Sequence, residues 1–108
     1  MDYCAVLVTF PNKDEADQLS AKLVEQKLAA CANRIDPVTS LFKWQNKIQN
    51  EQEVLVIYKT RSVLLQKFSD IVKANHSYDV PEIIALPIIG GSEDYMKWIK
   101  DETQSTGL

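Results

Sequence analysis

The distribution of apolar and polar positions predicts a strand followed by a helix at the start of the chain. Residues 3–10 (YCAVLVTF) form a nearly continuous apolar run rich in β-branched residues, which is typical of a strand covered on at least one face. Asn12 is followed three residues later by Glu15, the spacing of a helix capping box. Apolar residues then recur at helical spacing as far as Leu28, so we expect a helix up to this residue.

A second extended segment and a hairpin follow this helix. Residues 29–44 predict a long strand, in which Pro37 cannot donate a hydrogen bond to a neighbouring strand. We therefore expect this strand to lie at an edge of the sheet there, or to carry a bulge at Asp36 and Pro37. Residues 45–47 (QNK) suit a tight turn, because asparagine tolerates a positive φ. Residues 53–59 then predict the returning strand of a hairpin.

The second half of the chain again alternates between helix and strand. One apolar stripe runs along residues 61–74, which predicts a helix. Residues 82–89 predict a fourth strand, because Pro81 favours extended geometry in the residue before it and Gly90 and Gly91 end the apolar run. Ser92 is a suitable N-cap for a short last helix. That helix carries Tyr95, Trp98 and Ile99.

The element order β-α-β-β-α-β with an added C-terminal helix predicts an α+β fold of the ferredoxin-like type, as one domain over residues 1–108. Right-handed crossovers place both long helices on one face of an antiparallel sheet. The other face and the hairpin then carry more apolar surface than a soluble monomer normally exposes, so we expect self-association. The residues behind this expectation are Leu41, Phe42, Trp44, Val54, Val56 and Tyr58.

Composition narrows the function classes. The chain has 108 residues, of which 45% are hydrophobic and 25% charged, which is average for a soluble domain and disfavours disorder and membrane insertion. A net charge of -3 without a clustered basic surface argues against a nucleic-acid partner. The first residues lack the basic leader and long apolar stretch of a signal peptide. We therefore expect a cytoplasmic protein whose two cysteines, Cys4 and Cys31, are reduced and mostly buried.

Three sequence blocks, taken together, resemble one known family. They are LAACANRIDPVTSLFKW at 28–44, VLVIYKT at 54–60 and NHSYDVPEIIALPI at 75–88. In this order and at this chain length they resemble the CutA family of small divalent-cation tolerance proteins, from about Cys4 to about Ile99. The resemblance implies a homotrimer in which the long hairpins pair across subunits, and a protein that binds divalent metal ions.

The resemblance also implies a set of copper ligands. In CutA-like proteins the proposed ligands match Cys31, His76 and Glu82 of this chain, and Cu(II) accepts thiolate, imidazole and carboxylate together. His76 is the only histidine, and neither HExxH nor paired CxxC occurs, so a closed zinc site within one subunit is not supported. The alternative for Cys31 is a small buried residue. The alternative for His76 is a loop residue that interacts favourably with a helix C-terminus.

A second set of polar residues has two possible roles. Glu53 and Lys59 lie six residues apart and so share one face of a strand, while Glu82 opens the fourth strand directly after a turn from Tyr78 to Pro81. These groups could line a cleft between subunits, where Lys59 would bind a small anionic ligand. They could equally form a structural network at a trimer interface. In the family pattern Trp44 and Trp98 lie nearby, where simple packing is the alternative.

Other function classes share this fold. An acylphosphatase-type enzyme needs an arginine in a glycine-bearing loop after the first strand, and residues 10–13 read FPNK, so we expect no enzymatic activity. A trimeric sensor similar to the PII signalling proteins, with a ligand between subunits, is the nearer alternative. A non-catalytic trimeric scaffold is a further one. Ser77 stands where the family usually has proline, and Gln49 and Asn50 stand where relatives often have acids.

Overall fold

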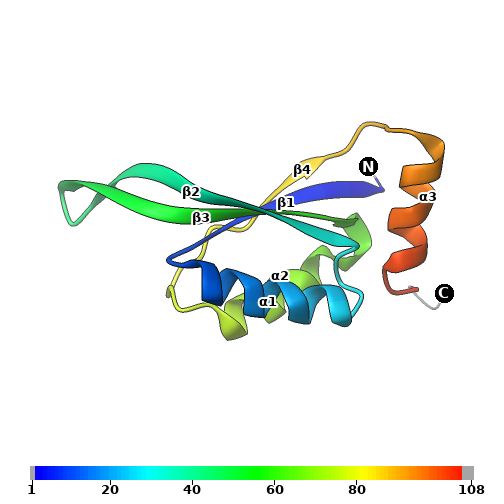
Figure 1. Ribbon diagram of the computed structural model, residues 1–108, viewed down its shortest axis with the longest axis horizontal. Helices are drawn as coiled ribbons and strands as arrows, with labels where there is room; N and C mark the ends of the chain where they lie inside the picture. The colour runs from blue at the N-terminus through cyan, green and yellow to red at the C-terminus, as the bar shows by residue number, and fades with distance from the viewer. Residues whose placement is uncertain (1, 106–108) are drawn as a thin grey trace.

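The sheet and its helices form two layers. The computed structural model describes residues 2–105, in which the strands are β1 (Tyr3–Phe10), β2 (Cys31–Trp44), β3 (Lys47–Arg61) and β4 (Ile84–Pro87). The helices are α1 (Lys13–Glu25), α2 (Leu65–Asn75), which follows a 3₁₀ turn at Ser62–Leu64, and α3 (Glu93–Glu102). The strands form one antiparallel sheet in the order β2-β3-β1-β4, and α1 and α2 lie on the same face of it (Figure 1). The predicted α+β ferredoxin-like arrangement is therefore confirmed.

Helix α1 begins as its sequence predicts and ends earlier. The side chain of Asn12 accepts a hydrogen bond of 2.9 Å from the backbone N–H of Glu15, which satisfies one of the free donors at the helix start. Lys27 then takes a positive φ of 61°, and the N–H of Leu28 bonds to the carbonyl of Leu23. This left-handed residue closes the helix, so Leu28 lies beyond its end although the apolar pattern continues to that position.

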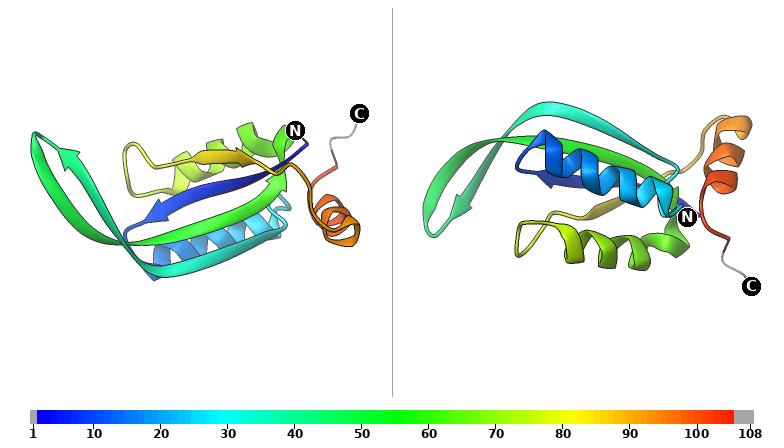
Figure 2. Two further views of the ribbon diagram at one scale, coloured as in Figure 1. Left: turned by 90° about the horizontal axis from the view of Figure 1, so that it is seen from above. Right: turned by 60° about the horizontal axis from the view of Figure 1, so that its bottom comes forward.

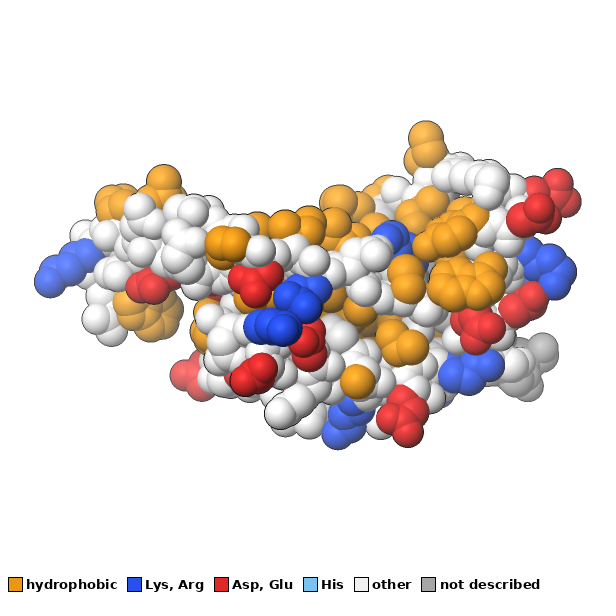
Figure 3. Space-filling model, viewed as in Figure 1, with side chains coloured by type: hydrophobic (Ala, Val, Ile, Leu, Met, Phe, Trp, Pro, Cys, Tyr) orange, Lys and Arg blue, Asp and Glu red, His pale blue; other side chains and the backbone are white. Residues whose placement is uncertain are grey.

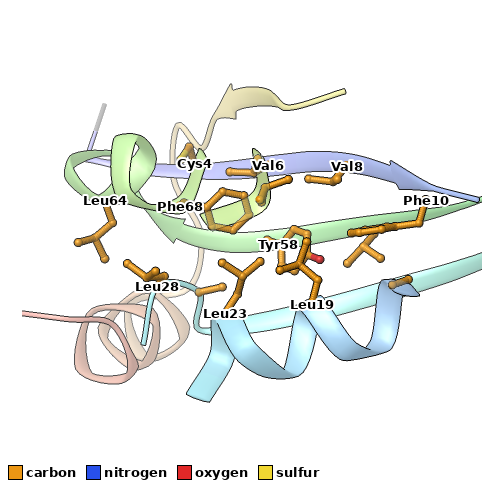
Figure 4. Packing of buried hydrophobic residues seen from close by; sticks show 14 of the residues in the cluster. Cys4, Val6, Val8, Phe10, Leu19, Leu23, Leu28, Tyr58, Leu64 and Phe68 are labelled. Atoms are coloured by element: carbon orange, nitrogen blue, oxygen red, sulfur yellow. The ribbon is translucent and has the colours of Figure 1, made fainter. Parts of the chain in front are cut away.

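The hydrophobic core lies between the sheet and the two helices. Alternate residues of β1 and β3 point toward the helices and are buried, and side chains from α1, such as Leu19 and Leu23, meet them there (Figure 4). Tyr58 and Phe68 make an edge-to-face contact with ring centroids 5.0 Å apart. The hydroxyl groups of Tyr58 and Ser20 lie 2.8 Å apart, which satisfies the one polar atom of this buried ring.

The face of the sheet away from α1 and α2 has a different apolar surface from the one expected. Val54, Val56 and Tyr58 are at most 3% exposed, so the expectation that they contribute to an uncovered surface is wrong. These residues point toward the helices, and the residues between them point the other way. The strand register places apolar residues of all four strands next to one another on the side of the sheet away from the helices. We call this surface the open face; its apolar residues are Ala5, Leu7, Ile35, Leu55, Ile57, Ile84 and Leu86.

Strands β2 and β3 extend far beyond the rest of the molecule as a hairpin (Figure 2). Gln45 and Asn46 both have positive φ and form the two-residue turn that the sequence predicts. The pairing shifts register between Ile35 and Val38, so the bulge expected around Pro37 is present. The returning strand begins at Lys47 rather than near residue 53. The exposed side chains of this projecting part include Leu41, Phe42, Trp44 and Ile48.

Two local expectations need correction. Strand β4 is only four residues long, so Glu82 precedes it instead of opening it. Cys31 lies at the start of β2 and is only partly buried, whereas Cys4 is buried as expected. Both cysteines are free, and strand β3 separates the strands that carry them. None of the helices in the described part of the chain is long and apolar enough to cross a membrane.

Replacing Phe68 by alanine tests the position of the core. The ring is fully buried against Tyr58, so the substitution leaves a cavity and should lower the free energy of unfolding by about 3–5 kcal/mol. Val63→Ala is the control, because Val63 is largely exposed and its loss should change this free energy by no more than about 0.5 kcal/mol. Denaturant unfolding at one fixed protein concentration gives the free energy of unfolding of both variants. An equal loss in the two variants would contradict the burial of Phe68.

The buried tyrosine predicts a loss of stability at high pH. Burial raises the pKa of Tyr58 from its ordinary value of 10.0 to about 12. Between these two values the unfolded chain loses this proton while the folded chain keeps it, so stability should fall as the pH rises from 10 to 12. The variant Tyr58→Phe should lack this part of the pH dependence. The free energy of unfolding of both proteins is measured at several pH values from 10 to 12. An equal fall in this free energy for the two proteins would contradict the prediction.

Candidate functional site

A groove lies between the projecting hairpin and the loop that connects α2 to β4. Its volume is about 950 Å³, and Trp44 and Phe42 contribute part of its apolar wall. Four of its side chains are carboxylates, and no lysine or arginine among the described residues lines it. These carboxylates are Glu51, Glu53, Asp79 and Glu82. The groove therefore has a negative charge that favours a cation over an anion.

Glu53 and Tyr78 form the centre of this groove. The Tyr78 hydroxyl donates a hydrogen bond of 2.7 Å to Oε2 of Glu53, whose side chain is nearly buried. Burial raises the pKa of Tyr78, and the bond to Glu53 raises it further because it stabilises the protonated phenol. Burial, followed by the negative charge of Glu53, also raises the pKa of Glu82. A bound cation would relieve this repulsion between the two carboxylates.

His76 lies beside the groove with a side chain that is 0% exposed. Its Nδ1 accepts a hydrogen bond of 3.0 Å from the backbone N–H of Tyr78, so this nitrogen carries no proton. Nε2 therefore carries the proton and donates it to the carbonyl of Thr9 at 2.7 Å. A carboxylate oxygen of Glu15 lies 3.6 Å from Nδ1, but the shorter bond from Tyr78 assigns the neutral ring. Neither ring nitrogen is free for a metal ion.

A second group of polar and aromatic residues lies at the other end of the open face. Sγ of Cys31 lies 3.7 Å from the Tyr95 hydroxyl, and Lys59 donates a hydrogen bond to Oδ1 of Asn33. Tyr95 and Trp98 of α3 have ring centroids 5.5 Å apart and are both partly exposed. In Figure 3 hydrophobic side chains gather over α3, far from the hairpin. This end supplies a thiol, a cation and aromatic surface.

The proposed copper ligands do not meet within one chain. Cys31 pairs across the sheet with Lys59, which pairs with Ala5, whereas His76 stacks on Phe10. Phe10 lies five positions after Ala5 along an extended strand, which corresponds to about 17 Å. Within residues 2–105 no group of three or more His, Cys, Asp or Glu side chains is placed to hold a metal ion. A copper site built from one subunit is therefore not formed.

The second predicted set is also divided between the two ends. Trp44, Glu53, Tyr78 and Glu82 line the groove, while Lys59 and Trp98 belong to the Cys31 end. Trp44 is 63% exposed, so it does not pack within its own subunit. Lys59 shares a sheet face with Glu53 as expected, but their six-residue separation keeps them about 20 Å apart.

Sequence reasoning missed several residues at both ends. Glu51 and Asp79 join the groove, and Asn33 and Tyr95 join the Cys31 end. For two of them the spacing was an available signal. Asn33 lies two residues after Cys31 and so on the same face of β2, and Tyr95 lies one helical turn before Trp98.

Comparison with solved structures confirms the fold. The crystal structure of CutA1 from Oryza sativa is similar to this chain with a TM-score of 0.95 and 43% sequence identity, covering 98% of this chain and 97% of that one. The periplasmic divalent cation tolerance protein CutA from Archaeoglobus fulgidus gives a TM-score of 0.92 and 38% identity, with coverages of 94% and 99%.

Sequence comparison corrects the expected location. The chain is 46% identical over 100 residues to "Protein CutA, chloroplastic" from Arabidopsis thaliana, a match that covers 93% of this chain and 55% of that relative. The chain thus spans little more than half the length of this relative. Because one related protein is described as chloroplastic and another as periplasmic, the prediction of a cytoplasmic protein is contradicted.

The family to which the chain belongs follows from a match that covers nearly the whole chain. The family model of the CutA1 divalent ion tolerance protein matches residues 4–102, which include the groove, the Cys31 end and all of the sheet except Tyr3. The fold, the sequence blocks and the identities to the relatives all agree with this match. The chain belongs to the CutA1 divalent ion tolerance protein family.

Proposed function

We propose that this protein forms a homotrimer and binds divalent metal ions, with Cu(II) as the ion bound most tightly, at junctions between its subunits. The observation that carries the metal-binding part is the pair of carboxylates in the groove, Glu53 and Glu82: burial, followed by the negative charge of Glu53, raises the pKa of Glu82. Carboxylate oxygens bind divalent cations, and a given set of ligands binds Cu(II) more tightly than the other common divalent transition metals.

Self-association is supported by surface that one chain leaves uncovered. The open face is apolar across all four strands, and its β4 side chains Ile84 and Leu86 are each nearly half exposed. Figure 3 shows hydrophobic side chains along the side of the sheet away from α1 and α2. The hairpin adds Leu41 and Trp44, both more than 60% exposed. A soluble protein normally covers such surface with a partner, and the family resemblance indicates two further copies of this chain.

A head-to-tail arrangement of copies would complete the metal site. The two ends of the open face carry different groups: carboxylates line the groove, and Cys31 and Lys59 lie at the other end. Head-to-tail contacts close into a ring when the rotation between neighbours allows it. In such a ring Cys31 of one copy could join Glu53 and Glu82 of the next, a ligand set that Cu(II) accepts.

A second candidate function is the binding of a small anionic ligand at the same junction. Lys59 favours it, because this residue supplies a cation on the open face next to the amide of Asn33 and close to aromatic surface.

We propose either role as a binding role without a catalytic step. Supporting this, His76, the only histidine, has both ring nitrogens engaged in hydrogen bonds and offers no free general base.

Removing single ligands should weaken copper binding. We expect Glu82→Gln and Cys31→Ala each to reduce Cu(II) affinity by at least about tenfold in a calorimetric titration of the reduced protein. Glu25→Gln is the matched control, since it removes a carboxylate at the exposed end of α1 and should leave the affinity unchanged. If both ligand variants titrate like the control, the metal site is not where we place it. Saturable binding of ATP that Lys59→Met abolishes would favour the second candidate.

The assembly is tested by molar mass. Light scattering should give three times the chain mass of 12.3 kDa for the unmodified protein. We expect Leu86→Lys to yield monomers with an unchanged circular dichroism spectrum, because the new charge lies on the open face and outside the core. Val24→Lys is the control, as it places the same charge on exposed helix surface and should leave the trimer intact. A monomeric unmodified protein would refute the proposal.

A further inference from the structure

The loop between α2 and β4 is attached to the rest of the molecule through the ring of His76. The N–H of His76 bonds to the carbonyl of Val72 and so ends α2, which fixes the backbone at one side of the ring. Its Nε2–H donates to the carbonyl of Thr9 in β1, and its Nδ1 accepts the backbone N–H of Tyr78. A single side chain therefore connects a helix end, a strand and the loop.

Packing leaves this ring little freedom to move. It stacks on Phe10 with centroids 4.8 Å apart and an interplanar angle of 18°, and it meets the ring of Tyr78 at the same distance on a tilt. Its side chain has no exposed surface. Glu15 of α1 is the charged group that faces it, and a carboxylate oxygen of Glu15 also accepts the N–H of Ser77. The ring and this carboxylate together hold the first residues of the loop.

The fixed position of the Tyr78 backbone also determines where its side chain lies in the groove. From this fixed backbone the Tyr78 side chain reaches Glu53 and donates its hydroxyl proton to Oε2. The carboxylate of Glu53 is thereby oriented from a loop whose own position depends on His76. The chain of contacts runs from the Thr9 carbonyl through the imidazole and the Tyr78 amide to the Glu53 carboxylate.

We infer that His76 is a positioning residue for the groove and not a metal ligand. A metal ion could bind Nδ1 only by displacing the Tyr78 N–H, or Nε2 only by removing the proton given to Thr9. Either change would leave a partly buried backbone group without its partner, which costs free energy. His76 thus acts on the carboxylate through Tyr78. This role in cation binding depends on the proposed function, whereas the role in holding the loop does not.

The first experiment uses metal-free protein, so that it is independent of copper binding. Nitrogen NMR of the imidazole should show the neutral ring with its proton on Nε2. In His76→Phe, which keeps a stacking ring but has no nitrogen, exchange of the Tyr78 amide hydrogen should become at least about tenfold faster, because its acceptor is gone. Asn75→Ala is the matched control. It removes the side-chain hydrogen bonds of Asn75 with Ile71 and Lys22 at the same helix end, and it should leave the exchange rate of the Tyr78 amide hydrogen unchanged. A proton on Nδ1, or unchanged exchange in His76→Phe, overturns the inference.

The second experiment separates positioning from ligation in the copper-loaded protein. The electron paramagnetic resonance spectrum of the unmodified protein should show no coupling to an imidazole nitrogen. His76→Phe and Tyr78→Phe should lower Cu(II) affinity by similar factors, and the double variant should bind no more weakly than either single variant, since both act through one path. Imidazole coupling would identify His76 as a ligand, and additive losses would show that it does not act through Tyr78; either result overturns the inference. If no copper binds at all, the proposed function fails while the amide-exchange result still decides how the loop is held.

Discussion

The antiparallel pairing of β3 with both β1 and β2 is the constraint on which the rest of the structure depends. Side chains alternate along an extended strand, so this pairing decides which residues of three strands face the helices. A slip of one residue would move Tyr58 out of the core and Ile57 into it. The same pairing carries β2 and β3 together beyond the body of the molecule, where the hairpin forms one wall of the groove.

The length of the paired strands also explains why the chemistry is divided. Cys31 and Lys59 lie where β2 begins, while Glu53 lies where the hairpin leaves the body, and a rigid sheet keeps these positions apart. No rearrangement of side chains can bring them together within one chain. Residues that resemble one site in the sequence therefore become two separate sets of groups. Assembly is the remaining means by which they can meet, and the uncovered open face supplies the surface for it.

Much of the fold follows from local sequence patterns, whereas the site depends on contacts between distant segments. The cap at Asn12, the turn at Gln45 and Asn46 and the bulge near Pro37 each reflect short-range chemistry, and the sequence indicates them. Periodicity predicted the shared face of Glu53 and Lys59 correctly, but a common face says nothing about separation along a strand. The errors at Val54 and Val56 arose because an apolar residue does not reveal toward which face of a sheet it points.

The role of His76 could not be read from its neighbours in the sequence. Its position at the end of α2 was expected, but Thr9 is 67 residues away in the chain, and only the folded structure places its carbonyl next to the ring. Cys31 presented the opposite difficulty. Free cysteine is usually buried, but this one lies at a strand end beside α3 and keeps part of its surface. In both cases the deciding contact comes from another element of the fold.

Strand β3 carries two kinds of positions in strict alternation. Val54, Val56 and Tyr58 belong to the core, and the intervening Leu55 and Ile57 belong to the open face. A substitution at one position therefore acts mainly on folding, and a substitution at the next acts mainly on the outer surface. During evolution the surface of this protein can consequently diverge while its core is maintained, even though both are encoded within the same few residues.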